Sequence, residues 1–129
     1  EERVRRKPAF YQRIIHSSIA LLIRMHQQNV SHNHFHRRNI VFDKNGNPEI
    51  IDLSMAQMYT KPPSNKIEFL RRNAWDLQAV TRIVGNLTQR IHPNTDYNYH
   101  DFTEQILMEY RKYLPTFGVT AIEIMDFGQ

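Results

Sequence analysis

A turn signal near the middle of the chain constrains the fold more than any other feature. The residues Lys44-Asn45-Gly46-Asn47 separate two short runs with β-branched content, 39–43 and 48–52. An Asn-Gly pair favours the tight turn with positive φ angles that joins antiparallel strands. The sequence therefore predicts a β-hairpin, and the register that the turn sets brings Asn39 and Asp52 together at its open end.

Helical patterns lie on both sides of this hairpin. Residues 10–26 carry apolar side chains too densely for a narrow stripe, which indicates a helix buried on much of its surface. Pro8 fits the first turn of that helix, and Asn29 can adopt the left-handed conformation that ends one. Residues 73–84 read as a second, amphipathic helix. We therefore expect two helices, one before the hairpin in the sequence and one after it.

Composition predicts one small domain. The chain has 129 residues, of which 40% are hydrophobic, and this is enough apolar material for a single core. Residues 101–113 have helical periodicity, while 118–127 fit either a short helix or a strand. No apolar run reaches the ~18 residues of a membrane span, and the absence of Cys excludes disulfides and thiolate chemistry. We expect residues 1–7 to form a basic arm and 8–129 a single domain.

The segment that leads into the hairpin has a distinctive order of residues. It reads His32-Asn33-His34-Phe35-His36-Arg37-Arg38-Asn39, and the hairpin then ends in Ile51-Asp52-Leu53-Ser54. This order resembles the catalytic segment of protein kinases, His-Arg-Asp-Leu-x-x-x-Asn followed by Asp-Phe-Gly, and the His-Gly-Asp-Leu-His-Pro-x-Asn of aminoglycoside- and choline-kinase-like relatives. The resemblance covers roughly residues 8–90. It implies a mainly helical α+β fold similar to the C-terminal lobe of the kinase-like fold, without the N-terminal β lobe.

The resemblance assigns the chemistry to three positions. Asn39 corresponds to the metal-binding asparagine and Asp52 to the metal-binding aspartate, so these residues would bind the nucleotide's Mg²⁺, weakly or not at all. His34 occupies the position of the catalytic aspartate, the general base. Phosphoryl transfer needs an amide oxygen and a carboxylate on the metal, with a proton acceptor beside the attacking hydroxyl. The sequence therefore retains the metal positions and replaces the base.

Three other residues match positions that support the loop. The resemblance implies that His32 packs in the core and bonds to the backbone, and that His36 matches the His-Pro position of the small-molecule kinases. It implies that Asp76, in the second helix, holds the backbone of the 32–39 segment. A simpler interpretation places Asp76 near a helix N-terminus, where the macrodipole stabilises a carboxylate. The two interpretations are compatible.

The replaced base and the short N-terminal region argue against catalysis. A neutral imidazole can accept a proton near pH 7, but His34 cannot supply the permanent negative charge of an aspartate. Before Pro8 there are only seven residues, and no Gly precedes Gly46 to form a phosphate-binding loop. We therefore expect a catalytically inactive, pseudokinase-like interaction or regulatory module that uses no cofactor. The alternative is an atypical phosphotransferase that uses ATP and Mg²⁺, with His34 as its base.

The histidines permit a different interpretation. His32, His34 and His36 occupy alternate positions, so in an extended strand all three face one side, as ligands of zinc or nickel would. The kinase-like resemblance explains the same residues without a metal, and the chain has no Cys to complete the ligand set. Three loop histidines with structural roles are the preferred interpretation.

Charge raises a third class of function. The formal net charge is +4, and Arg37 and Arg38 lie beside the predicted site, where they would meet a phosphate or an acidic partner. No aromatic residues alternate with the basic clusters as in RNA-binding segments, so an anion- or nucleic-acid-binding domain is an alternative with a weak, salt-sensitive affinity. We instead expect a protein partner or a second copy of the chain on the surface left by the missing lobe, and no membrane. The compartment we expect is the cytoplasm or nucleus, with a processed secreted product as the alternative.

Overall fold

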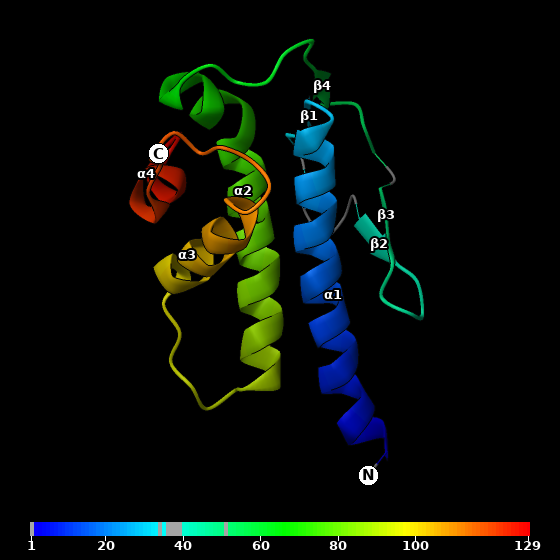
Figure 1. The fold of residues 1–129 in the computed structure, drawn as a ribbon. Coiled ribbons are helices and arrows are strands. Elements are labelled where there is room, and N and C mark those ends of the chain that lie inside the picture. The colour runs from blue at the N-terminus through cyan, green and yellow to red at the C-terminus, as the bar shows by residue number, and fades with distance from the viewer. Residues whose placement is uncertain (1, 34, 36–39, 51) are drawn as a thin grey trace.

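The computed structural model describes residues 2–33, 35, 40–50 and 52–129, and side chains within its helices and strands from Lys7 onward. Two long helices, α1 and α2, lie side by side, with short strands on the outer flank of α1 and two further helices beside α2 (Figure 1). The prediction of a mainly helical fold with a short hairpin is confirmed. The elements in order are α1 (Glu2–Gln27), β1 (Val30–Ser31), β2 (Ile40–Phe42), β3 (Pro48–Ile50), β4 (Gln57–Met58), α2 (Lys66–Ile91), α3 (Tyr99–Tyr110) and α4 (Ala121–Asp126).

Helix α1 begins earlier than the sequence predicts. It includes Pro8 in its interior and extends back to Glu2, so residues 2–7 of the expected separate arm are part of the helix. A proline removes one backbone donor from a helix, and the charged residues that precede it favour helical backbone. At the other end, Asn29 has a φ of 59°, the left-handed conformation expected where the helix ends.

The predicted hairpin is present. Strands β2 and β3 pair antiparallel with Ile40 opposite Ile50, and the turn between them closes through a hydrogen bond from the Gly46 N–H to the Asp43 carbonyl. Gly46 has a φ of 81°, and an added Cβ would lie 3.0 Å from the Cβ of Arg13. The turn therefore needs glycine both for its backbone conformation and for its close approach to α1.

A second pair of strands lies beside the end of α1. Strand β1 pairs antiparallel with β4, with Val30 opposite Met58, and the backbone N–H of Tyr59 donates to the carbonyl of Asn29. After the hairpin, the chain therefore passes through β4, beside the end of α1, before it enters α2. Asn65 then caps α2, because its side-chain oxygen accepts from the N–H of Glu68.

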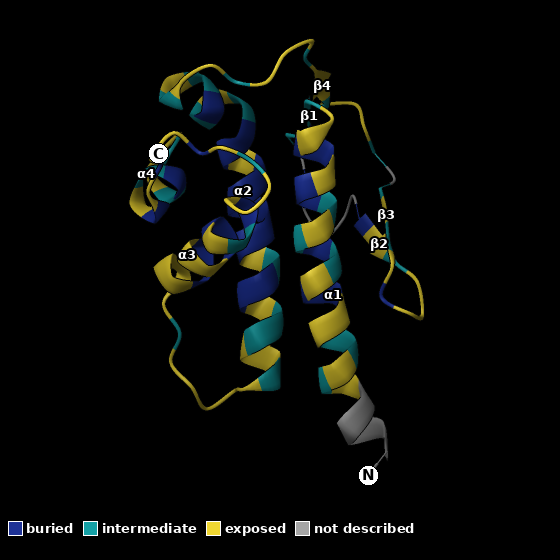
Figure 2. Ribbon diagram, viewed as in Figure 1, coloured by how far each residue is buried: buried dark blue, intermediate teal, exposed yellow. Residues whose placement is uncertain are grey.

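The core lies between α1, α2 and α3. Buried side chains are concentrated on α2, and α1 combines buried positions with exposed ones on the side turned toward the viewer (Figure 2). Thr81 on α2 and Thr103 on α3 bring their hydroxyl oxygens within 3.2 Å of each other inside this core. The largest fully buried apolar side chains come from all three helices and from the loop after β1: Leu22, Phe35, Phe69, Leu77, Ile106, Leu107 and Tyr110.

Residues 118–127, which fit either a short helix or a strand by sequence, contain the helix α4. Thr120 and Glu123 make a reciprocal capping box at the start of α4. At the other end, the side-chain amide of Gln78 on α2 donates to the carbonyls of Ile124 and Phe127, at 2.8 and 2.9 Å. None of the helices in the described part of the chain combines the length and apolar character needed to cross a membrane.

Candidate functional site

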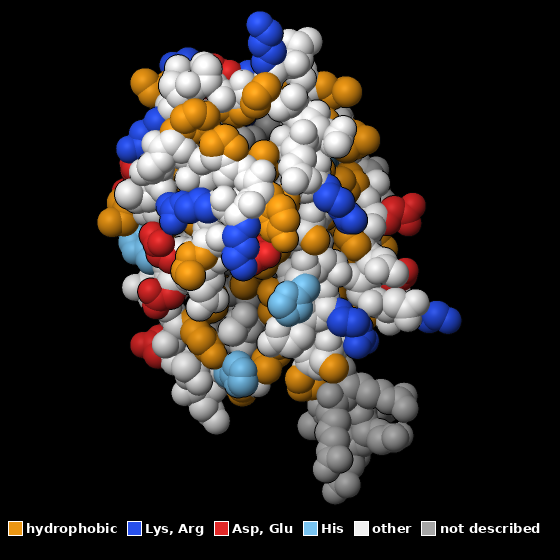
Figure 3. All heavy atoms as spheres, in the orientation of Figure 1, with side chains coloured by type: hydrophobic (Ala, Val, Ile, Leu, Met, Phe, Trp, Pro, Cys, Tyr) orange, Lys and Arg blue, Asp and Glu red, His pale blue; other side chains and the backbone are white. Residues whose placement is uncertain are grey.

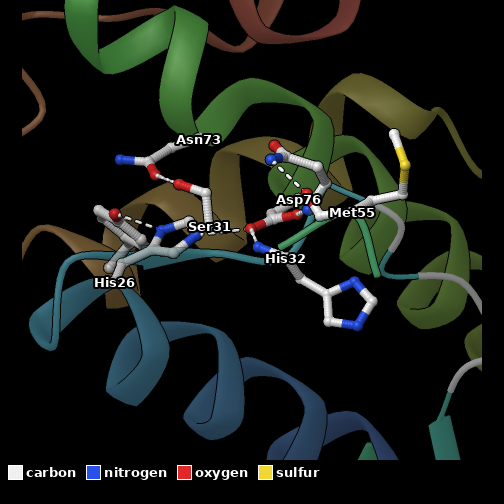
Figure 4. A network of polar contacts seen from close by, with 8 residues as sticks. His26, Ser31, His32, Met55, Asn73 and Asp76 are labelled. Carbon is white, nitrogen blue, oxygen red and sulfur yellow. Dashed lines mark hydrogen bonds and ion pairs between the residues drawn. The ribbon is translucent and has the colours of Figure 1, made fainter. Parts of the chain in front are cut away.

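The carboxylate of Asp76 fastens the start of the 32–39 segment to α2. One oxygen, Oδ2, accepts from the backbone N–H of His32 at 2.9 Å, and the other, Oδ1, accepts from the N–H of Asn33 at 2.8 Å. Asp76 is completely buried, so water does not compete for either oxygen (Figure 4). The structure thus contains the contact that the kinase-like resemblance implies for this aspartate.

The same carboxylate also binds the end of α1. His26 Nε2 lies 2.9 Å from Asp76 Oδ2, and His26 Nδ1 lies 2.8 Å from the hydroxyl of Tyr110 on α3. Because a carboxylate only accepts, Nε2 is the nitrogen that donates to Asp76, and Nδ1 of a neutral ring is then free to accept the Tyr110 O–H. A single buried chain of hydrogen bonds therefore connects α1, α2, α3 and the loop after β1.

Burial sets the ionisation of the tyrosine in this network. Desolvation raises the pKa of Tyr110 far above its ordinary value, and the nearby charge of Asp76 raises it further. The hydroxyl therefore keeps its proton throughout the physiological range and can serve as a donor to His26. The rings of Tyr110 and His26 also meet edge to face, with centroids 5.7 Å apart.

Two further bonds hold the same loop. The hydroxyl of Ser31 donates to the side-chain oxygen of Asn73, which precedes Asp76 by one helical turn on α2, at 3.1 Å. The side-chain amide of Asn33 donates to the carbonyl of Met55 at 3.1 Å, and Asn33 itself has a φ of 67°. The loop after β1 is thus tied on one side to α2 and on the other to the segment that follows the hairpin.

The position of Asp76 decides between its two interpretations. Helix α2 starts at Lys66, ten residues before Asp76, whereas the predicted helix starts at position 73. The macrodipole acts within the first turn of a helix, so it does not account for this carboxylate. The helix extends further toward the N-terminus because the side chain of Asn65 caps its first turn.

Asp52 lies at the open end of the hairpin, half-buried. Its Oδ1 accepts from the backbone N–H of Ser54 at 2.9 Å, which closes a short turn after β3. The proposed metal partner Asn39 lies outside the described residues, as do His34, His36, Arg37 and Arg38. Among the described residues no group of three or more His, Asp or Glu side chains is arranged to hold a metal ion.

His32 packs in the core, as the resemblance implies. It is completely buried, and its ring meets the ring of Phe35 edge to face with centroids 5.6 Å apart. A side chain in this position orders the loop from within, whereas a metal ligand in an exposed strand would face solvent. The packing therefore favours the structural role of His32.

Sequence reasoning did not identify His26 and Tyr110 as members of the site. They lie 84 residues apart, and each belongs to a helix whose apolar pattern explains its burial without any polar role. The available signal was the polar ring of His26 near the end of an apolar helix, three residues before Asn29. Only the tertiary packing shows that both residues point toward Asp76.

No protein-family model matches this chain, and neither a curated protein nor a solved structure matches it.

Proposed function

We propose that this chain is a protein-interaction module built on a kinase-like C-terminal lobe, and that it does not transfer phosphate. The observation that carries the proposal is the attachment of the His32 and Asn33 amides to the buried carboxylate of Asp76. An aspartate that holds the catalytic-loop backbone from a following helix is what the resemblance implies for a kinase-like lobe. Here it holds a loop whose base position is His34.

The order of elements also supports a kinase-like lobe. A long buried helix, α1, leads through β1 into the 32–39 segment, and a tight hairpin then presents Asp52 at its open end. The chain returns through β4 to a second long helix that carries Asp76. The motif residues and their supporting elements therefore occur in the sequence order that the resemblance requires.

The side chains that hold the backbone of His32 and Asn33 are not accessible to a substrate. His26 and Asp76 have side chains that are 1% and 0% exposed, so neither can contact a substrate hydroxyl. Their hydrogen bonds are satisfied within the protein, and they act by ordering the loop. Transfer would then depend on His34, which lacks the permanent negative charge that orients a hydroxyl in these enzymes. The replaced base, together with a buried network that has a structural role, favours binding over catalysis.

The interaction surface that we propose lies around the hairpin and β4. Four apolar side chains there are exposed to solvent: Met58 at 82%, Leu53 at 59%, Met55 at 52% and Val41 at 49%. They belong to the stretch of chain from β2 to β4, whose strands lie beside α1 (Figure 1). Exposed methionine and leucine side chains adapt to the surface of a partner. We expect another protein, or a second copy of this chain, to cover them in the cytoplasm or nucleus.

Calorimetry with ATP and Mg²⁺ tests the absence of phosphotransfer chemistry. We expect no Mg²⁺-dependent heat of binding at millimolar ATP, in the wild type and in Asp52→Asn alike. Saturable binding that requires Mg²⁺ and is lost in Asp52→Asn would contradict the proposal and establish the phosphotransferase alternative. In that case, a gain of transfer in His34→Asp would show that the site is intact except for its base.

A further inference from the structure

A cleft lies between α1 and the end of α3, away from the loop and hairpin described above. Its volume is about 490 Å³, within the range of sites that hold small organic ligands. Its floor is apolar and comes from α1, where Ile19 and Ile23 are at least half-buried and Ala20 leaves space above the helix. Tyr113, just beyond α3, adds an exposed aromatic side chain on the opposite side.

The cleft is elongated along α1. Its lining residues on this helix run from His16 to Gln27 at spacings of three and four, so they form one continuous face. The eleven helical steps from His16 to Gln27 span roughly 16 Å. Hydrophobic side chains are visible near the centre of Figure 3, with basic, acidic and histidine side chains around them. A long, narrow ligand with an apolar body fits this shape better than a compact polar one.

The charges around the cleft favour an anionic ligand. Arg24 is exposed at one end of the apolar floor, and among the described residues no carboxylate lies within ion-pair distance of it. The acidic residue of the lining, Glu109, is paired with Lys112 at 2.8 Å, and this hydrogen bond raises the pKa of Lys112. The guanidinium of Arg24 is therefore the charge available to a ligand, and its planar donors suit a carboxylate.

We propose that this cleft binds an elongated amphipathic carboxylate. The apolar body lies on Ile19, Ala20 and Ile23, and the carboxylate accepts hydrogen bonds from Arg24. This site is independent of the proposed interaction surface, because none of its residues belongs to the hairpin or to β4.

Three probes with the same alkyl chain and different head groups test the proposal: decanoate, decanol and decyltrimethylammonium, each below its critical micelle concentration. We expect calorimetry to show saturable binding of decanoate, with decanol at least about tenfold weaker and the cationic probe weakest. Amide resonances of α1 from position 16 to 27 should shift in the titration. Equal affinity for decanoate and decanol, or no binding of decanoate, would overturn the proposal.

Two variants separate the apolar and charged parts of the site. Arg24→Gln should reduce the affinity for decanoate to that for decanol, while Arg82→Gln, an exposed arginine on α2 outside the cleft, should leave it unchanged. Ala20→Phe should fill the cleft and weaken all probes, and circular dichroism checks that each variant is folded. Decanoate affinity that is unchanged in both Arg24→Gln and Ala20→Phe would place the ligand elsewhere and overturn the assignment.

Discussion

The two halves of the 30–58 segment are held in different ways. At its start, the backbone of His32 and Asn33 is bonded to a buried carboxylate that comes from 43 or more residues away. In the hairpin turn, the Asp43 carboxylate accepts from close neighbours, the backbone N–H groups of Asn47 and Asn45 and the side-chain amide of Asn47, and these bonds lower the pKa of its exposed carboxyl. Polar bonds in the first half connect helices, whereas those in the turn shape the turn alone.

This difference explains why we propose the hairpin, and not the start of the loop after β1, as a surface for a partner. The start of the loop after β1 belongs to the core, because His32 and Phe35 are buried and the amides of His32 and Asn33 are bonded to Asp76. The hairpin packs one side on that core through Ile40, Phe42 and Ile50, and its other side carries Val41 to solvent. A surface that is shaped locally can change to suit a partner while the buried network keeps the fold.

Removal of the Asp76 carboxylate should have the largest effect. Asp76→Ala leaves His26 and two backbone N–H groups buried without an acceptor, and we expect it to lower the free energy of unfolding by about 3–5 kcal/mol. Urea denaturation measures the change. Asp126→Ala, an exposed aspartate at the end of α4, serves as the control and should stay within ~0.5 kcal/mol of the wild type. Similar losses in both variants would contradict the role assigned to Asp76.

Loss of the Tyr110 hydroxyl should have an intermediate effect. Tyr110→Phe keeps the ring in the core and deprives His26 Nδ1 of its partner, so we expect a loss of about 1–2 kcal/mol. The matched control is Tyr113→Phe, in which an exposed tyrosine loses its hydroxyl at little cost. Thermal and urea denaturation of both variants compare them. Equal stability of Tyr110→Phe and the wild type would show that the hydroxyl does not contribute.

Alkaline pH should weaken the same contact. Because the pKa of Tyr110 is raised in the folded protein, its contribution to stability is complete below the unfolded pKa of ~10 and decreases as the pH rises above that value. The free energy of unfolding should therefore fall above about pH 10, with a smaller slope in Tyr110→Phe. An identical slope in the two proteins, measured by urea denaturation across this range, would contradict the burial-driven shift.

The hairpin turn should respond more weakly. Gly46→Ala places a side chain at positive φ and against Arg13, and we expect a loss of about 1 kcal/mol. Gly118→Ala has similar strain, with a φ of 73°, but nothing lies within 4 Å of the added Cβ. The difference between the two variants in urea denaturation measures the contact with α1. No difference would mean that the hairpin tip moves away from α1 without cost.

Changes on the proposed interaction surface should affect stability least. Leu53→Ser and Met58→Ser replace exposed side chains, so each should shift the free energy of unfolding by less than ~0.5 kcal/mol. If a second copy of the chain covers this surface, sedimentation velocity should show concentration-dependent association that both variants weaken. Association that is unaffected by either variant would place the interface elsewhere.

Much of the fold follows from local sequence signals. The Asn45-Gly46 turn and the dense apolar pattern of residues 10–26 predicted the hairpin and the first helix, because both depend on neighbouring residues. The start of α2 was predicted too late, since the cap at Asn65 follows two prolines that favour a linker. Residues 118–127 fit a helix or a strand by their apolar pattern alone. The Thr120–Glu123 capping box, which that pattern does not reveal, favours the helix.

The site divides in the same way. The motif resemblance pointed to Asp76 as a support of the loop, because it fixes which helix follows the hairpin. His26 and Tyr110 could not be found in this way, since their contact joins the end of α1 to the end of α3 across the core. The cleft beside α1 was equally hidden, because its apolar floor has the spacing of an ordinary buried helix face.

Hydrogen exchange at the amides of His32 and Asn33 tests the central claim most directly. We predict slow exchange of both amides in the wild type and loss of that protection in Asp76→Asn, whose side chain has one acceptor oxygen in place of two. The amide of Asn47, bonded within the hairpin turn, serves as the internal reference and should be unchanged. Fast exchange of His32 and Asn33 in the wild type, or equal protection in Asp76→Asn, would contradict the account.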